Sequence, residues 1–323
     1  EIDPVYKSSA ASDVYKRQGS DPLDGLGYSP AGAHVLDGSF VMNVGNVHIN
    51  ITNWGLIGST YSSPFPWSIA PSCQWPAGSG DEYLWSSGLW VGGIMLGERL
   101  VSTGGLNSEF LPIPEDVNST IYEAVDAKLV RPAGNPGASG RRKPMPDPDD
   151  DGDGLVDEEI LNGEDDDGDG LVDEDFGQIG NQMFVLTNYD NTRLAIENFP
   201  DHTPMNLQVV QTSFQWENDQ VDDFVGFDYQ INNIGVVDIE NVYIGFYSDS
   251  DIGPRGLGGT AADDMAGSWP PFHGSPGLVR ASDGGFAPVQ IGFMYDAAME
   301  GRIEGFFGIV FLGHDVDPSG ELA

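Results

Sequence analysis

The stretch from Glu82 to Thr103, EYLWSSGLWVGGIMLGERLVST, indicates the fold class of this chain more clearly than any other. Its apolar residues between Leu89 and Leu96 are dense enough for a strand that is buried on both faces of a sheet. Gly97 interrupts the run and favours a turn. We therefore predict two strands joined around Gly97, within an all-β fold.

Period-two alternation extends the β pattern toward the N-terminus. Val47, Ile49 and Ile51 are separated by polar residues within the range 40–54, which is typical of a half-buried strand. The range 121–130 is ambiguous, because apolar residues four apart fit a helix and residues two apart fit a strand. We favour a strand for this range.

The C-terminal half carries further strand patterns, at 182–188, 206–216, 223–232, 240–247, 289–295 and 303–312. The alternation slips between Val209 and Val210, which predicts a β-bulge. A turn at 233–235 predicts a hairpin that joins the two strands around it. Strands at this spacing, with Gly and Asn turns, predict antiparallel β-sandwich regions.

Composition limits the possible partners. The chain has 323 residues, enough for two domains, with 44 Gly, 22 Pro and 11% aromatic residues, which favour strands and turns. Its formal net charge of −38 argues against nucleic acid and against anionic membranes as partners. Cys73 is the only cysteine, so no intrachain disulfide is possible. No apolar run reaches the length needed for membrane insertion.

An acidic stretch, from Asp147 to Asp175, lies between the two β regions. Sixteen of its 29 residues are Asp or Glu, and none is Lys or Arg. The segment DDDGDGLVDE occurs at 149–158 and again, unchanged, at 165–174. Like charges at this density repel one another, so a compact form of the stretch requires bound cations.

The spacing within each copy matches a calcium loop. Carboxylates stand at loop positions 1, 3, 5 and 9, a glycine at position 6 allows a sharp turn, and the carbonyl of position 7 adds an oxygen. Ca²⁺ takes six to eight oxygen ligands, which such a loop supplies. The expected ligands are Asp149, Asp151, Asp153, Leu155, Asp157 and Glu158 in the first loop, and Asp165, Asp167, Asp169, Leu171, Asp173 and Glu174 in the second.

The loops resemble the calcium loops of thrombospondin type 3 repeats and dockerins, which are relatives of the EF-hand. The EF-hand has a bidentate Glu at position 12, whereas this chain has Ile160 and Phe176 there. Neighbouring acidic residues such as Glu159 and Asp175 are the expected substitutes. The period of the repeat leaves no room for paired helices, so we expect short loops that bind two Ca²⁺ ions. An acidic disordered linker is the alternative.

The acidic stretch also suggests a domain organisation. We expect an N-terminal β domain at 19–135, a linker with the calcium-binding repeat at 136–180, and a truncated C-terminal β-sandwich at 181–323. Residues 1–18, EIDPVYKSSAASDVYKRQ, differ in composition and resemble translated sequencing-adapter sequence. They are therefore excluded from the fold prediction as an artefact.

A wider resemblance covers residues 40–313. The segments NVHINITNWGLIGS at 46–59, MNLQVVQTSFQW at 205–216 and NVYIGFYSDSDIG at 241–253 resemble the N-terminal regions of large secreted proteins from Bacteroidetes. Those proteins typically end in a type IX secretion sorting domain. The resemblance implies that this chain is secreted or lies at the cell surface.

Catalytic signals are weak. The five His are scattered without an HExxH pattern, no GxSxG elbow occurs, and Cys73 has no His nearby. We therefore expect no catalytic residues and no enzymatic activity. Trp67, Trp75 and Trp85 could stack on sugars, although aromatic residues near turns more often fill the ends of a sandwich.

A second acidic group flanks predicted strand ends: Asp249, Asp251, Asp263, Asp264 and Asp296. If these strand ends converge, the carboxylates could hold a further Ca²⁺; a solvated loop rim is the alternative.

Together these patterns predict a calcium-binding extracellular structural or adhesion segment of a bacterial protein, with other surface proteins or glycans as partners. Two alternatives stay open. One is a non-catalytic accessory part of a secreted hydrolase, and the other is a carbohydrate-binding module.

Overall fold

The computed structural model describes residues 38–59, 70–113, 121–125, 161–162, 165, 168, 170, 176–255, 263–269, 277–280, 286–289, 291–297, 303 and 305–313. The chain forms two compact units, which are described separately. The N-terminal unit ends at Asp249 and the C-terminal unit begins at Ser250. Regular structure is almost entirely antiparallel β, which confirms the all-β prediction. No helix among these residues is long and apolar enough to cross a membrane.

The first sheet of the N-terminal unit has two parts. One part has the strand order β11 (Glu240–Asp249), β5 (Ser86–Met95) and β6 (Glu98–Thr103). The other part contains four shorter strands in chain order, β1 (Ser39–Met42), β2 (His48–Thr52), β3 (Cys73–Gln74) and β4 (Asp81–Glu82). Ile57 links the two parts, because it pairs with Ile51 on one side and with Ser87 on the other.

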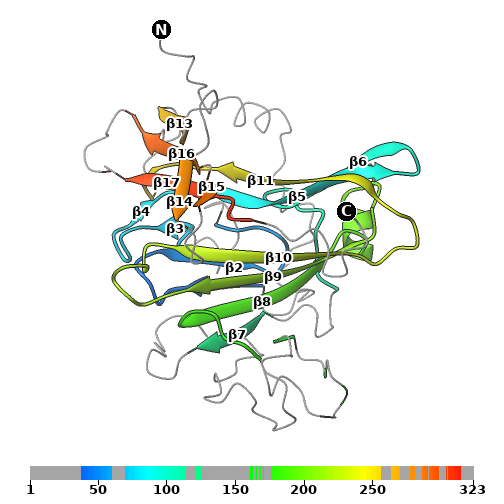
Figure 1. Cartoon of the computed structure of the whole chain (residues 1–323), viewed down its shortest axis with the longest axis horizontal. Coiled ribbons are helices and arrows are strands. Elements are labelled where there is room, and N and C mark those ends of the chain that lie inside the picture. Colours follow the sequence, from blue (N-terminus) through cyan, green and yellow to red (C-terminus); the bar gives the residue numbers. More distant parts are fainter. Residues whose placement is uncertain are drawn as a thin grey trace. The chain divides into compact units, whose positions relative to one another are not determined.

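The second sheet consists of four strands that lie side by side in Figure 1. Their order is β10 (Val225–Asn233), β9 (Leu207–Gln215), β8 (Gln182–Tyr189) and β7 (Tyr122–Val125). The pairing of β7 with β8 brings together the two chain segments that precede and follow the acidic stretch. The choice of a strand for the ambiguous range is therefore confirmed over Tyr122–Val125, and residues 126–130 lie outside the described ranges.

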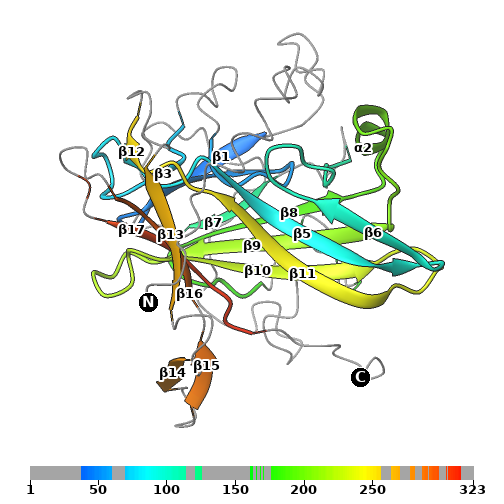
Figure 2. The ribbon, with the colours of Figure 1, turned by 90° about the horizontal axis from the view of Figure 1, so that it is seen from above.

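The two sheets pack face to face around one apolar core. Its buried members come from β5, from β9 and from the segments beside them: Leu89, Val91, Phe110, Met205, Leu207 and Val209. At another point the rings of Phe40 and Phe184 meet edge to face, with centroids 6.4 Å apart. Figure 2 shows β5 and β11 overlying β9 and β10. The predicted β-sandwich is thus present in this unit.

The strand pairing crosses the predicted domain boundary. β5 pairs with β11, and β7 pairs with β8, so the ranges 19–135 and 181–249 contribute strands to the same sheets. The predicted division into separate β domains at 19–135 and 181–323 is therefore wrong, and the chain divides after Asp249 instead. Alternation shows that a segment is a strand, but it does not identify a partner far away in the sequence.

Three local predictions can be compared with the strands. The hairpin around Gly97 is confirmed, with both Leu96 and Gly97 in the left-handed region at φ 54° and 84°. The single strand expected within 40–54 is instead the hairpin of β1 and β2. The hairpin expected at 233–235 is wrong, because β10 and β11 belong to different sheets and the segment between them crosses from one layer to the other.

The bulge expected between Val209 and Val210 is also wrong. β9 keeps an uninterrupted register with β8 and with β10. Val209 belongs to the core between the sheets, while Val210 packs on the opposite face of β9. Two consecutive apolar residues occur here because apolar groups cover both faces of this sheet.

The C-terminal unit contains two antiparallel groups. The strands β13 (Asp264–Trp269), β16 (Ile291–Asp296) and β17 (Phe306–Val310) form a sheet in that order. A separate hairpin consists of β14 (Gly277–Arg280) and β15 (Phe286–Val289), and the short β12 (Gly253–Pro254) precedes both groups. Phe293, Tyr295 and Phe306 make mutual ring contacts on the three-stranded sheet.

Candidate metal centre

The described residues include only one of the twelve expected calcium ligands, Asp165. The others lie outside the described residues: Asp149, Asp151, Asp153, Leu155, Asp157, Glu158, Asp167, Asp169, Leu171, Asp173 and Glu174. Within the described ranges, no group of three or more His, Cys, Asp or Glu is arranged as a metal-binding set. The prediction that the two loops bind calcium therefore stays a prediction.

The carboxylate of Asp165 organises the start of the second loop. Its Oδ1 accepts a hydrogen bond from the Gly168 amide at 2.7 Å, and its Oδ2 accepts one from the Gly170 amide at 3.0 Å. Gly168 and Gly170 have φ values of +87° and +100°, which side chains other than glycine rarely adopt. The amides of Gly168 and Gly170 therefore both point toward the Asp165 carboxylate.

The free lone pairs of this carboxylate are relevant to cation binding. An ionised carboxylate offers about four acceptor sites, and the two backbone bonds use only part of them. Asp165 can therefore hold the curled backbone and bind a cation at the same time. The sequence pattern identified the glycine at position 6, Gly170, but it gave no role to Gly168 at position 4.

Two apolar residues attach the acidic repeat to the second sheet. Leu161 and Phe176 are 1% and 5% exposed, and both belong to a cluster on the face of β7 and β8 that points away from the core. The other buried members of this cluster are Tyr122, Ala124, Met183 and Val185. Phe176 occupies the position where an EF-hand has its Glu, so packing explains this departure from the EF-hand pattern.

These two anchors are not among the residues predicted from the sequence. The apolar pairs inside the loops, Leu155–Val156 and Leu171–Val172, lie outside the described residues. The available signal was the presence of isolated apolar residues at the edges of the acidic loops. An apolar residue beside a dense run of charge has little reason to be there unless it is buried.

The second acidic group is split between the two units. Asp249 ends β11 in the N-terminal unit, where its carboxylate accepts a hydrogen bond from the Tyr247 hydroxyl at 3.2 Å and burial raises its pKa. The C-terminal unit contains the other four carboxylates. Asp264 and Asp296 are directly paired across β13 and β16, and both are buried.

A buried ion pair lies at one end of the sandwich. His202 Nδ1 is 3.2 Å from Glu109 Oε1, and the two side chains are 2% and 17% exposed. Burial of each group opposes its charge, but the mutual hydrogen bond and attraction prevail, so the pKa of His202 is raised and that of Glu109 is lowered. The scattered sequence positions of the five His do not predict this pair.

The surroundings of His202 indicate a structural role. Its Nε2 contacts the backbone carbonyl of Asp190 at 3.2 Å, so neither ring nitrogen faces a hydroxyl or thiol nucleophile. The Asp190 carboxylate accepts hydrogen bonds from the Ser102 hydroxyl and from the Met205 and Leu207 amides. These bonds fix β6 against the start of β9.

Cys73 lies in surroundings that disfavour its thiolate form. The residue is buried in β3, and burial together with the nearby Glu82 carboxylate raises its pKa to about 12. Glu82 is itself held by the amides of Ser72 and Cys73, at 2.9 and 3.0 Å. Since the thiolate is the reactive form, this environment does not favour nucleophilic chemistry.

The tryptophans differ in their surroundings. Trp75 packs edge to face on Tyr83 and donates its Nε1 hydrogen bond to Asp223 at 2.6 Å, so its ring has a structural role. Trp85 is half-buried, and Trp67 lies outside the described residues. A more open ring occurs on β5, where Trp90 is 40% exposed and stacks on Tyr247 with an angle of 10° between the rings.

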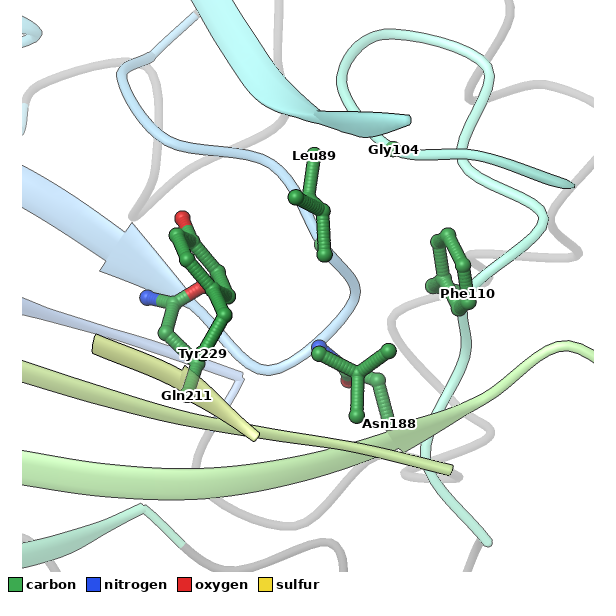
Figure 3. Close-up of a pocket in the computed structure, with 8 residues that line it drawn as sticks. Leu89, Gly104, Phe110, Asn188, Gln211 and Tyr229 are labelled. Atoms are coloured by element: carbon green, nitrogen blue, oxygen red, sulfur yellow. The ribbon is translucent and has the colours of Figure 1, made fainter. Parts of the chain in front are cut away.

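An internal cavity of about 10 Å³ lies between the sheets. Figure 3 shows six of its lining residues, Leu89, Gly104, Phe110, Asn188, Gln211 and Tyr229. Three of these contribute buried polar atoms without a hydrogen-bond partner, namely Asn188 Oδ1, Gln211 Nε2 and Tyr229 Oη. Burial raises the pKa of Tyr229. The cavity has room for one water molecule and not for an organic ligand.

Comparison with known proteins adds no family to this description. No protein family matches the chain, and no curated protein and no solved structure shows significant similarity to it. The class defined by the fold is therefore an antiparallel all-β protein whose N-terminal unit is a sandwich with an acidic repeat attached to one sheet.

Proposed function

We propose that this chain is a calcium-stabilised structural or adhesion segment of a bacterial protein that acts outside the cell. The observation that carries the proposal is the second loop, which curls around Asp165 through two positive-φ glycines. The loop is followed by the buried anchor Phe176. This arrangement gives the repeated carboxylates a fixed base on the second sheet, from which each loop can close around one Ca²⁺.

The cation would have a mechanical effect on the fold. Without it, the repeated carboxylates repel one another between the two strands β7 and β8. With it, the loops close and their ends at Leu161 and Phe176 are held against the sheet. A ligand that binds only the folded form stabilises it by about 2.7 kcal/mol at a hundredfold excess over its dissociation constant. Two ions would therefore supply a substantial part of the stability of a domain, which is roughly 5–15 kcal/mol.

Calorimetric titration of the whole chain tests the proposal. We expect two ions to bind to the repeat, with dissociation constants of about 10⁻³ to 10⁻⁵ M. Asp151→Ala combined with Asp167→Ala should abolish this binding. Asp219→Ala, which removes an exposed carboxylate far from the repeat in sequence, is the matched control and should leave it unchanged. Equal calcium heats in all three proteins would refute the proposal.

Glycan binding is a second candidate function, favoured by one feature of the β5–β11 pair. Three aromatic residues each lie opposite a glycine in this ladder: Trp90 opposite Gly245, Tyr247 opposite Gly88, and Tyr243 opposite Gly92. Alternate residues of a strand share a face, so the three rings lie on one side of the sheet. Flat aromatic surfaces of this kind stack on sugar rings. Binding of a polysaccharide panel tests this function independently of calcium.

A further inference from the structure

Strand β11 forms one edge of the three-stranded part of the first sheet. It pairs with β5 on one side, and no strand in the described part of the chain pairs with its other side. Figure 2 shows β11 at the outside of β5 and β6. Alternate residues of an edge strand direct their backbone N–H and C=O groups away from the sheet, where a further strand can pair with them.

The first six residues of β11 are exposed, and several of them are apolar. Val242, Tyr243 and Ile244 are 51%, 75% and 51% exposed, although consecutive residues of a strand point to opposite faces. This half of the strand is therefore open to solvent on both faces. The pairing with β5 is irregular between Glu240 and Tyr243 and continuous from there to the end of the strand. A partner strand thus finds a regular edge from Tyr243 onward.

The composition of this edge differs from that of a protected edge. Natural edge strands are commonly blunted by charged residues, by Pro or by a short length. β7 is only four residues long, and β6 begins with Glu98 and Arg99. By contrast, residues 241–247 of β11, NVYIGFY, contain no charged residue and no Pro, and they are rich in the β-branched and aromatic residues that favour strands. Such a segment at the edge of a sheet is prone to pair with another strand.

The charges around this segment indicate what kind of strand fits it. Asp238 and Glu240 precede the uncharged segment and Asp249 ends β11, so acidic residues flank it at both ends. A second copy of the chain would place an acidic end of one β11 beside an acidic end of the other, and like charges on adjacent strands are destabilising. The formal net charge of −38 on each chain adds to this repulsion. A strand with basic ends is attracted instead.

We propose that the outer edge of β11, from Tyr243 to Phe246, binds an extended segment of a partner protein by strand addition. The segment has β-branched or aromatic residues in its centre and Lys or Arg near its ends. Backbone hydrogen bonds supply the affinity, while pairs with Tyr243 on one face and Ile244 on the other select the side chains. The site differs from the sugar-binding side of the sheet, although Tyr243 contributes to both, and it does not depend on calcium binding by the acidic repeat.

Calorimetric titration of the whole chain with a synthetic peptide tests the proposal. The probe is a short peptide of alternating Val and Thr with a Lys at each end, and we expect it to bind. N-methylation of its backbone amides along both edges should weaken binding by at least about tenfold, because it removes backbone hydrogen bonds and leaves the side chains in place. The same peptide with a Glu at each end should not bind, since it meets like charge.

Ile244→Asp separates strand pairing from simple charge attraction. The added carboxylate strengthens the attraction to Lys, but it disfavours a strand and loses water when a partner covers it, so binding should fall by at least about tenfold. Val101→Asp is the matched control, because Val101 is 48% exposed on β6, at the opposite edge of these three strands, and binding should stay unchanged. The thermal transition of each variant shows whether it remains folded, and the N-methylated peptide tests the parent chain in any case.

Several results would overturn the proposal. No binding of the Lys peptide, equal binding of its N-methylated form, or tighter binding by Ile244→Asp would each mean that strand pairing is not involved. Loss of binding in Val101→Asp alone would assign the site to β6. Self-association of the chain without peptide, abolished by Ile244→Asp, would show that a second copy occupies this edge and would reject the basic partner strand.

Discussion

Leu161 and Phe176 bury their side chains in the same hydrophobic cluster, although the second acidic loop separates them in the sequence. The cluster lies on the face of β7 and β8 opposite the sandwich core. A loop with both of its ends held in this way has less conformational freedom to lose when a cation binds. We therefore expect the packing of these two apolar residues to favour cation binding by the loop between them.

Truncation of the anchors tests this coupling. We expect Phe176→Ala to lower the free energy of unfolding of the N-terminal unit by about 3–5 kcal/mol and Leu161→Ala by about 2–5 kcal/mol, because both leave cavities. Each should also weaken calcium binding by the repeat. Urea unfolding with calcium and with chelator measures both effects. Ile179→Ala is the control, since Ile179 is 43% exposed and its loss should cost under about 0.5 kcal/mol.

The backbone of the second loop can be tested without changing its charge. Gly168 has a φ of +87°, and an added Cβ would meet no atom there, so Gly168→Ala introduces backbone strain and no clash. We expect a cost of about 1–2 kcal/mol for closing the loop, and about tenfold weaker calcium binding. Limited proteolysis should then require more calcium to protect the repeat. Gly78→Ala, at another open position with φ of +80°, should leave calcium binding unchanged.

The raised pKa of Asp264 predicts how stability depends on pH in the absence of calcium. Between the ordinary value of 3.8 and the folded value of about 7, the folded chain holds a proton that the unfolded chain has released. Stability is therefore highest below 3.8 for this group and falls as the pH rises through 7, by on the order of 2–4 kcal/mol. Asp264→Asn should flatten this part of the profile. An identical slope in the variant would show that Asp264 is not its source.

The Glu109–His202 pair predicts a different pH range in which the stability of the fold is highest. The raised pKa of His202 contributes stability that is complete below its ordinary value of 6.5 and is lost as the pH rises through the folded value. The lowered pKa of Glu109 contributes stability above its ordinary value of 4.5, which is lost at lower pH. Glu109→Gln should therefore be most destabilising between these two values, by about 1.5–3 kcal/mol.

Chemical unfolding of the parent and of Glu109→Gln across this range measures the effect. Glu197→Gln serves as the control, because Glu197 forms only an exposed ion pair with Arg193. That exposed pair should contribute no more than about 0.5 kcal/mol. A constant difference between parent and Glu109→Gln at every pH would contradict the assigned role of His202.

The aromatic face of β5 and β11 gives a prediction for glycan binding. Trp90→Ala should abolish retention on a polysaccharide that binds the parent, since stacking on Trp is the main expected contact. Tyr243 lies on the same face and is 75% exposed, so Tyr243→Ala should also weaken retention. Val236→Ala, at a fully exposed residue of the β10–β11 connection, should have no effect. Retention that survives Trp90→Ala would exclude this face as the binding surface.

The sequence by itself determined the local elements. The strands β5 and β6 and the turn at Gly97 follow from a dense apolar run and one glycine, which act over a few residues. The repeated spacing of carboxylates and glycines, which predicts Asp165 at position 1 and Gly170 at position 6 of a calcium loop, is likewise a local property of the sequence. Alternation also identified β9, although it could not show that Val209 and Val210 pack on opposite faces of the sheet.

Only the tertiary structure decided which of these elements meet. It paired β5 with β11 and β7 with β8, placed Leu161 and Phe176 in one cluster, and separated Asp249 from the other four carboxylates. It also joined Glu109 to His202 across a long stretch of chain. The physical reason is that such contacts depend on strand order and register, which are set by packing of the whole sandwich and not by local periodicity.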